Sequence, residues 1–352
     1  MSQDAIRVGV VGAGGNTRTK HIPNLQAIEG VEVVSVCNRS RQSSQRAADE
    51  FGIPTVYDQW WELIAANDTD AIVIGTWPYL HRRATVAALN AGKHVMCEAR
   101  MAMNASEAIA MRAAARANPH LVAQIVPSPM TLGVDKTIQK LMAQDYLGAV
   151  LAIEVRALGN DFIDPAAPLT WRQDKDLSGL NVMSLGIWYE AILRWVGEAE
   201  RVSAMGKSAI SMRRDDEAGR LRNARVPEHI TVMADMACGA QATISISTLA
   251  GLSGPPEVFI YGEKGTLRFA GGTLYGGQKG DESLNPVAVA AQDVGGWRVE
   301  EEFINAVRGQ EVITHTNFED GVKYMIFTEA VALSMAEGRT ISLPSLLANR
   351  GG

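Results

Sequence analysis

Short apolar runs rich in β-branched residues alternate with amphipathic segments through the first third of the chain. The runs predict buried strands at 6–11, 31–37, 54–57, 71–75, 94–97 and 121–126. Segments with helical spacing lie between them, at 21–29, 42–51, 59–66, 82–91 and 104–117. This alternation of strand and helix predicts an α/β fold with a doubly wound parallel sheet.

The pattern changes after residue 126. Alternating apolar and polar residues predict strands at 150–156, 228–236, 240–248, 257–261 and 266–269, joined by glycine-containing turns. Helices are expected at 182–196, 299–307 and 324–337. Because 352 residues is long for one domain, we expect two, at 1–126 and 127–352.

The first strand runs into the sequence G-A-G-G-N-T. Gly12, Gly14 and Gly15 allow a tight turn and a close approach of the backbone to a pyrophosphate. A helix that opens at this turn directs free N–H groups at phosphates, so we also place Asn16 in the predicted cofactor loop. Thr17 stands where the G-x-G-x-x-G pattern has its third glycine.

The end of the second strand bears on the choice of dinucleotide. An Asp or Glu at this point hydrogen-bonds the ribose 2′-hydroxyl of NAD, whereas this chain has Asn38, Arg39, Ser40 and Arg41. The missing acid and the two arginines favour NADP(H), with NAD(H) as the alternative, because Ser40 and Arg41 could hold a phosphate. The alternative interpretation is a solvated loop in which Ser40 caps a helix.

Composition narrows the function classes. The net charge is −6 with both signs interspersed, which argues against nucleic-acid and membrane-surface partners. The three cysteines are far apart and show no metal-ligand spacing, so we expect buried thiols and no metal site. The first residues lack the apolar core of a signal peptide and no run could span a membrane. We therefore expect a cytoplasmic protein with a small-molecule substrate.

Several motifs, in order and spacing, resemble the Gfo/Idh/MocA family of NAD(P)-dependent oxidoreductases. They are V-G-V-V-G-A-G-G, G-T-W-P-Y-L-H, A-L-N-A-G-K-H-V-M-C-E, W-R-Q-D-K-D-L-S-G and L-G-I-W-Y-E-A-I-L-R-W. The resemblance implies an N-terminal Rossmann domain for the dinucleotide. It also implies a C-terminal α/β domain with a large, mostly antiparallel sheet for substrate binding and oligomerisation. Sugars or polyols as substrates, and a homodimer or homotetramer, are further implications.

The chain departs from the family at the positions that usually carry acid–base chemistry. Where the family has E-K-P, this chain has Glu98, Ala99 and Arg100. The family's D-x-x-x-H positions are Ser184 and Trp188. A proton-transferring group contributes about 10²–10⁴-fold in rate, and neither Ala99 nor Trp188 can supply it. Either other residues do this chemistry or the usual chemistry is absent.

Three nearby residues are candidate replacements. Arg100 could stabilise an oxyanion or hold an anionic group, and its alternative interpretation is a salt bridge. Tyr189 or Glu190 could act as an acid or base, although neighbouring helical residues face different directions and core packing is the alternative for Tyr189.

The remaining candidates surround the expected cleft. Thr76, Trp77, His81 and Glu98 follow predicted strands and are expected to bind the cofactor. Trp171 and Trp188 could form an aromatic wall for the substrate, and Arg172 is a substrate contact by resemblance.

These observations leave three functions open. The first is an oxidoreductase of a sugar-like or other small hydroxylated or carbonyl compound, with a non-standard acid–base set. The second is a nucleotide-dependent enzyme that cleaves a glycoside or ether through transient oxidation. The third is a non-catalytic nucleotide-binding sensor or regulator.

Overall fold

The computed structural model describes residues 5–350, which form two compact units. Over these residues unit 1 comprises 5–127 and 298–322, and unit 2 comprises 128–297 and 323–350. Residues 298–322 therefore pack with the first unit, although the sequence pattern placed them in the second domain.

Unit 1 contains a six-stranded parallel sheet with the order β3-β2-β1-β4-β5-β6. Its strands are β1 (Ile6–Val11), β2 (Val31–Cys37), β3 (Thr55–Val56), β4 (Ala71–Ile74), β5 (His94–Cys97) and β6 (Ala123–Ile125). The strands are buried because apolar side chains such as Val10, Ile72 and Val95 occupy both faces. The strand order reverses between β1 and β4, where ligands bind in open α/β sheets. The predicted doubly wound parallel sheet is confirmed.

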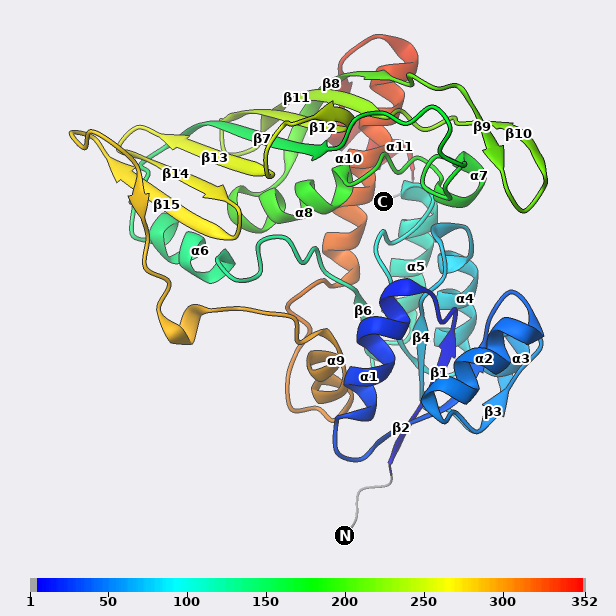
Figure 1. Cartoon of the computed structure of the whole chain (residues 1–352). Helices are drawn as coiled ribbons and strands as arrows, with labels where there is room; N and C mark the ends of the chain where they lie inside the picture. Colours follow the sequence, from blue (N-terminus) through cyan, green and yellow to red (C-terminus); the bar gives the residue numbers. More distant parts are fainter. Residues whose placement is uncertain (1–4, 351–352) are drawn as a thin grey trace. The chain divides into compact units, whose positions relative to one another are not determined.

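The helices of unit 1 follow the strands. They are α1 (Ile22–Gln26), α2 (Arg41–Phe51), α3 (Trp60–Ala65), α4 (Pro78–Asn90), α5 (Ala105–Ala117) and α9 (Val299–Val307). α1 is shorter than the helix expected at 21–29, because the chain first forms a π-helical turn at Thr17–His21. Helices α4 and α5 lie side by side, and α9 lies beside α1 (Figure 1).

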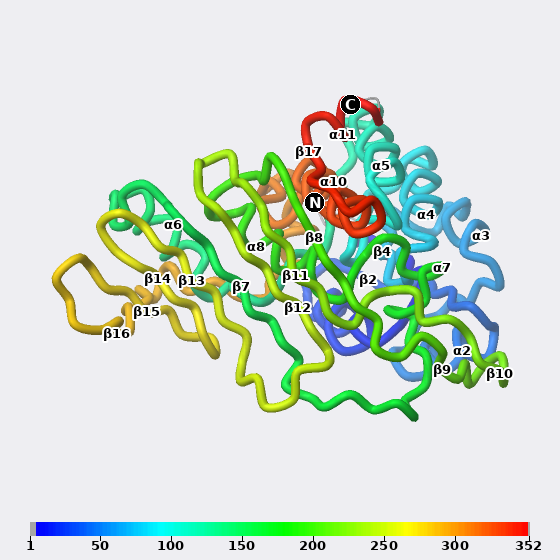
Figure 2. Tube along the Cα trace, turned by 90° about the horizontal axis from the view of Figure 1, so that it is seen from above, coloured from blue at the N-terminus to red at the C-terminus, as the bar shows by residue number. Residues whose placement is uncertain are grey.

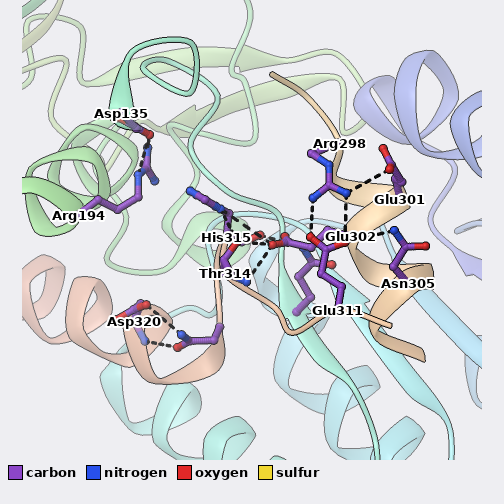
Figure 3. Close-up of polar contacts among 12 residues, drawn as sticks. Asp135, Arg194, Arg298, Glu301, Glu302, Asn305, Glu311, Thr314, His315 and Asp320 are labelled. Carbon is purple, nitrogen blue, oxygen red and sulfur yellow. Dashed lines mark hydrogen bonds and ion pairs between the residues drawn. The ribbon is translucent and has the colours of Figure 1, made fainter. Parts of the chain in front are cut away.

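Polar contacts attach the segment 298–322 to the rest of unit 1. Gln124, on β6, donates through Nε2 to Glu302 Oε2 at 2.8 Å, and Ile125 exchanges backbone hydrogen bonds with Thr316. Within the segment, Arg298 points toward Glu301 and Glu311 (Figure 3). These contacts link β6 to a segment that lies almost two hundred residues later in the sequence.

Unit 2 is built on a nine-stranded sheet with the order β16-β15-β14-β13-β7-β12-β11-β8-β17 (Figure 2). Its strands are β7 (Val150–Asn160), β8 (Ala199–Lys207), β11 (His229–Met236), β12 (Gln241–Gly251), β13 (Glu257–Gly262), β14 (Gly265–Ala270), β15 (Thr273–Gln278), β16 (Asn285–Pro286) and β17 (Ile341–Ser342). The β7–β12 pair is parallel and the other pairs are antiparallel. The expected large, mostly antiparallel sheet is confirmed.

Helices and one separate hairpin complete unit 2. The helices are α6 (Asp135–Ala143), α7 (Lys175–Ser178), α8 (Leu185–Val196), α11 (Leu343–Asn349) and most of α10 (Phe318–Glu337), with a short 3₁₀ turn at Ala291–Asp293. The hairpin consists of β9 (Met212–Asp215) and β10 (Arg220–Asn223) and forms its own two-stranded sheet.

One face of the large sheet carries the apolar residues. Ile230, Val232, Ile244 and Ile246 are buried, whereas Met233 on the opposite face is 55% exposed. This apolar face is therefore covered within the unit. The homodimer or homotetramer stays a prediction.

Candidate nucleotide site and its surroundings

A pocket of about 550 Å³ lies in unit 1, where β1, β2 and β4 end. It contains seven of the predicted cofactor-binding residues, namely Gly12, Gly14, Asn38, Arg39, Ser40, Thr76 and Trp77. The sequence signals of three separate strand ends thus meet in one cavity. This is the arrangement expected where the strand order of an open α/β sheet reverses.

The glycine loop is shaped by close backbone packing. Gly12 has a φ of +93°, and a Cβ on it would lie 2.6 Å from Thr76 Cγ2. Gly75 also lacks room for a side chain, because Thr17 and Gly12 lie against it. Around Gly15, in contrast, no atom lies within 4 Å of such a Cβ. The loop is therefore tight toward the β4 end and open at Gly15.

Asn38 connects the glycine loop to the start of α2. Its Oδ1 accepts a hydrogen bond from the Ala13 backbone N–H at 2.6 Å, and its Nδ2 donates to the Ser43 carbonyl at 2.9 Å. The Asn38 backbone N–H donates to Ser44 Oγ at 2.8 Å. An aspartate has no donor for the Ser43 carbonyl, so this contact requires an amide.

The predicted arginines and serine occupy different places. The Arg39 guanidinium lies over the Trp77 ring, 5.4 Å from its centroid, at the pocket. Ser40 caps α2 by accepting from the Ser43 N–H, which confirms the cap interpretation, and it also lines the pocket, where its phosphate-binding role stays a prediction. Arg41 instead pairs with Asp58 at 3.0 Å, with both side chains more than half exposed.

The pocket also contains residues that the sequence analysis missed. Ser43 and Arg46 lie three and six residues after the cap Ser40 and line the same pocket. Spacing by three along a helix places side chains on one face, and this signal was present in the sequence. Trp60 and Tyr79 add aromatic surface to the wall.

Glu98, which follows β5, contacts several polar groups of unit 1. Its carboxylate accepts from Asn16 Nδ2 and from the Ala99 N–H, and it lies 3.0 Å from His21 Nε2. On the other side of the imidazole, Nδ1 lies 2.5 Å from Glu300 Oε1. Glu300 is 279 residues from His21, so no local pattern could have indicated this pair.

The two carboxylates decide the charge of His21. Burial disfavours the imidazolium, but the hydrogen bonds to Glu300 and Glu98 outweigh it and raise the pKa of His21 to about 9. Burial likewise opposes ionisation of the carboxyls, yet the His21 cation holds the pKa of Glu98 and of Glu300 below the ordinary value. At neutral pH the cluster is a buried cation between two anions.

His81 and Arg100 are joined through the backbone. The two ring nitrogens of buried His81 lie 2.9 Å from the carbonyl oxygens of Arg100 and Thr76, and burial lowers the pKa of His81. The Arg100 side chain is 3% exposed. His81 thus fixes the backbone beside the pocket, and the predicted catalytic role of Arg100 stays a prediction.

The two candidates on α8 are held by packing inside unit 2. The Tyr189 hydroxyl accepts from the Ala199 N–H at 2.8 Å, and its ring stacks on Phe327 with centroids 3.6 Å apart. Burial raises the pKa of Tyr189. Glu190 accepts from Arg194 at 2.8 Å and from the Ser128 N–H at 3.0 Å. These contacts favour structural roles, and the catalytic assignments stay predictions.

Arg194 extends the buried ion pairs of α8. Its guanidinium also lies 2.9 Å from Asp135 Oδ2, and the two side chains point toward each other (Figure 3). Trp188, a predicted substrate contact on the same helix, is 3% exposed. Trp171 and Arg172 lie in the loop before α7, with the guanidinium 4.4 Å from the indole centroid. Arg172 is exposed and Trp171 is partly exposed.

Two models of known protein families match this chain. A model described as "Oxidoreductase family, NAD-binding Rossmann fold" matches residues 6–125, and the model of the GFO/IDH/MocA C-terminal domain matches residues 136–268. The chain belongs to the Gfo/Idh/MocA family of NAD-dependent oxidoreductases. The resemblance inferred from its motifs is confirmed.

Individual relatives are distant. The chain is 26% identical over 266 residues to an oxidoreductase of Synechocystis sp., which covers 74% of this chain and 71% of the relative. It is equally identical, at 26% over 266 residues, to trans-1,2-dihydrobenzene-1,2-diol dehydrogenase of Mus musculus, covering 74% and 73%. The structure of levoglucosan dehydrogenase with NADH and L-sorbose superposes with a TM-score of 0.86 at 21% identity, covering 97% and 100%.

The residues of the unit 1 pocket fit a dinucleotide. Gly14 and Gly15 are exposed and have no Cβ, so a pyrophosphate can approach the backbone there, whereas the Gly12 N–H donates to the Cys37 carbonyl. Trp77 and Arg39 offer flat surfaces to a base, and Ser40 offers a hydroxyl beside them. Among residues 5–350, no group of three or more acidic, histidine or cysteine side chains could hold a metal ion, and no helix is long and apolar enough to cross a membrane.

Proposed function

We propose that this oxidoreductase prefers NADP(H) to NAD(H) and acts on a cyclic, sugar-like polyol or the corresponding carbonyl compound. The observation that carries the cofactor preference is the amide of Asn38. Its Nδ2 donates to the Ser43 carbonyl, so the position that usually holds a ribose-binding acid is committed to an amide.

The polar surface next to Asn38 suits a 2′-phosphate. Arg39, Ser40, Ser43 and Arg46 line the same pocket and together supply two guanidinium groups and two hydroxyls. Guanidinium groups bind phosphate through paired, charge-assisted hydrogen bonds. Asp58 also lines this pocket, but its carboxylate is paired with Arg41. The local balance of charge therefore favours an additional phosphate.

The cofactor, when bound, supplies hydride transfer. The chain's own contribution in unit 1 is to bind the pyrophosphate at the glycine loop and to hold Glu98 ionised between Asn16 and His21. Ala99 and Trp188 replace the usual lysine and histidine, so the proton must move through a different set of groups. Arg100 is our candidate for stabilising negative charge on the substrate oxygen.

Support for the substrate class comes from two similar proteins and from the side chains of Trp171 and Arg172. One relative is a dehydrogenase of a cyclic diol, and one structural neighbour is a complex with L-sorbose. In this chain Trp171 and Arg172 stack on each other in an accessible loop. An indole face binds the apolar face of a sugar ring, and a guanidinium binds its oxygens.

Binding and turnover test this proposal. Titration of NADPH and NADH should give tighter binding of NADPH, and Arg46→Ala should reduce that preference by about 1.5–3 kcal/mol. Arg116→Ala is the matched control, because Arg116 lies on α5, away from the residues that line the pocket, and pairs with Glu319 at the surface. Equal or tighter binding of NADH to the unmodified protein would overturn the preference.

A panel of cyclic polyols, ketoses and glycosides separates the three functions. Net reduction of NADP⁺ supports the oxidoreductase. Cleavage of a glycoside or ether without net reduction indicates transient oxidation instead, which the absence of the usual lysine at Ala99 favours as the second candidate. Nucleotide binding with no turnover of any compound indicates a regulator.

A further inference from the structure

The loop that carries Trp171 and Arg172 is held by a separate structural element. The β9–β10 hairpin lies outside the nine-stranded sheet of unit 2. A backbone hydrogen bond attaches the hairpin to the loop: the Leu169 N–H donates to the Arg214 carbonyl at 2.8 Å. The hairpin thus contacts the chain two residues before Trp171.

A buried arginine makes the main attachment. Arg213 Nη1 donates to the carbonyl oxygens of Asp164 and Ala167, at 2.9 and 3.0 Å. Its Nη2 donates to Glu228 Oε1 at 2.6 Å. The two side chains are only 4% and 3% exposed. A planar guanidinium can serve two carbonyls and a carboxylate at once, which a lysine cannot do with the same geometry.

Glu228 continues the attachment to the other side of Trp171 and Arg172. Its Oε1 also accepts from Gln173 Nε2 at 3.1 Å, and its Oε2 accepts from the Ala209 and Ile210 N–H groups at 3.1 Å. Gln173 Oε1 in turn accepts from the Thr170 N–H at 3.0 Å. One buried ion pair therefore fixes the backbone both before and after the Trp171–Arg172 pair.

A second, partly exposed network reinforces this arrangement. Asp174 caps α7 by accepting from the Asp176 N–H at 3.0 Å, and it pairs with Arg222 of β10 at 2.8 Å. Arg225 pairs with Asp176 at 2.6 Å. Both ends of the loop segment from 164 to 176 are thereby connected to the hairpin or to the connection between β10 and β11.

We propose that Arg213 and Glu228 are positioning residues that hold Trp171 and Arg172 in the arrangement that binds substrate. This rests on the proposed function, in which Trp171 and Arg172 contact the substrate. The loop would otherwise lose backbone order, since it has no regular secondary structure between β7 and α7. Misplacement of binding groups by about 1 Å can cost about 10²-fold in rate.

The test compares Arg213→Met with Arg214→Met. Arg214 is adjacent on the same hairpin, and its side chain is 70% exposed and pairs with Asp216, so its loss leaves the buried contacts intact. In Arg213→Met we expect KM to rise and kcat/KM to fall by about 10²-fold, with kcat and NADPH affinity nearly unchanged. Arg213→Lys should recover part of the loss, because it restores the charge beside Glu228.

Hydrogen exchange provides a readout independent of turnover. Amides of residues 164–173 should exchange faster in Arg213→Met than in Arg214→Met, with unchanged exchange in β11 and β12. If Arg213→Met does not fold, Gln173→Leu applies the same test through the Thr170 and Glu228 contacts.

Each outcome decides the proposal. The proposal is overturned if Arg213→Met folds and its loop amides exchange faster, but KM is unchanged. It is also overturned if amide exchange at residues 164–173 is unchanged. If the unmodified protein turns over no compound, the proposed function fails. In that case hydrogen exchange alone tests whether Arg213 and Glu228 order the loop. Faster amide exchange in Arg213→Met that is confined to residues 164–173 supports this role.

Discussion

The nucleotide pocket of unit 1 and helix α8 of unit 2 were both expected to carry function, and they use their polar residues differently. In the pocket, Arg39, Ser40 and Thr76 line an open cavity of about 550 Å³. On α8, Tyr189 and Glu190 are 1% and 2% exposed and bind neighbouring protein groups. The polar residues at these strand ends line a pocket, whereas those on the buried helix form hydrogen bonds with other groups of the protein interior.

The physical reason lies in the backbone. Parallel strands end together at one sheet edge, so residues that follow them share that edge whatever the details of packing. A helical side chain faces the direction that its position on the helix dictates, and burial then requires a partner for every polar atom. The comparison predicts that pocket changes alter binding and α8 changes alter stability.

The largest effect that would test the pocket is expected from Gly12→Ala. A methyl group there is strained at a φ of +93° and meets Thr76 Cγ2 at 2.6 Å. Strain and overpacking of about 1–3 kcal/mol each should lower the free energy of unfolding and weaken nucleotide binding. Gly15→Ala is the control for stability alone, because no atom lies within 4 Å of its added Cβ. Denaturant titration of the two variants measures the loss of stability, NADPH titration measures the binding of Gly12→Ala, and an equal loss of stability in both variants would contradict the packing argument.

The next effect concerns the buried cation of unit 1. Folding raises the pKa of His21 from 6.5 to about 9, so its contribution to stability is complete below pH 6.5 and is lost as pH rises through 9. The loss should be on the order of 3 kcal/mol. Glu98 and Glu300 have lowered pKa values, so their contribution is instead lost as pH falls below 4.5.

Unfolding by urea between pH 6 and 10 measures this dependence. His21→Gln removes the titrating group and should flatten the curve in that range. A wild-type curve that stays flat between pH 6.5 and 9 would show that His21 is neutral in the folded protein.

Whether a feature of the fold or the site could be predicted from the sequence depends on how far apart in the sequence the contacting residues lie. The strands, the glycine turn and the Asn38 signal are local, and the sequence predicted them. Glu98 and Glu300, 202 residues apart by number, both contact the His21 ring, and no local pattern indicates such an arrangement. Likewise, the contact between Tyr189 and Phe327 is set by how α8 packs against α10.

Tyr189→Phe tests the α8 side of the comparison. The change keeps the ring on Phe327 and leaves the buried Ala199 N–H without its acceptor. We expect a loss of about 1–3 kcal/mol in the free energy of unfolding and an unchanged kcat. If Tyr189 were the acid or base, kcat would instead fall by about 10²–10⁴-fold. Calorimetry and steady-state kinetics on the same preparation distinguish the two.

The smallest effect on stability is expected from Asn38→Asp, which should nevertheless change the cofactor preference. The aspartate keeps the acceptor for the Ala13 N–H but loses the donor to the Ser43 carbonyl, a net change of about 0.5–1.5 kcal/mol. Its charge opposes a 2′-phosphate and suits a 2′-hydroxyl, so the preference should shift toward NADH. Asn38→Ala separates the causes, because it removes both hydrogen bonds without adding charge. If NADH affinity rises in neither variant while stability falls in both, Asn38 acts only as a link between the glycine loop and α2.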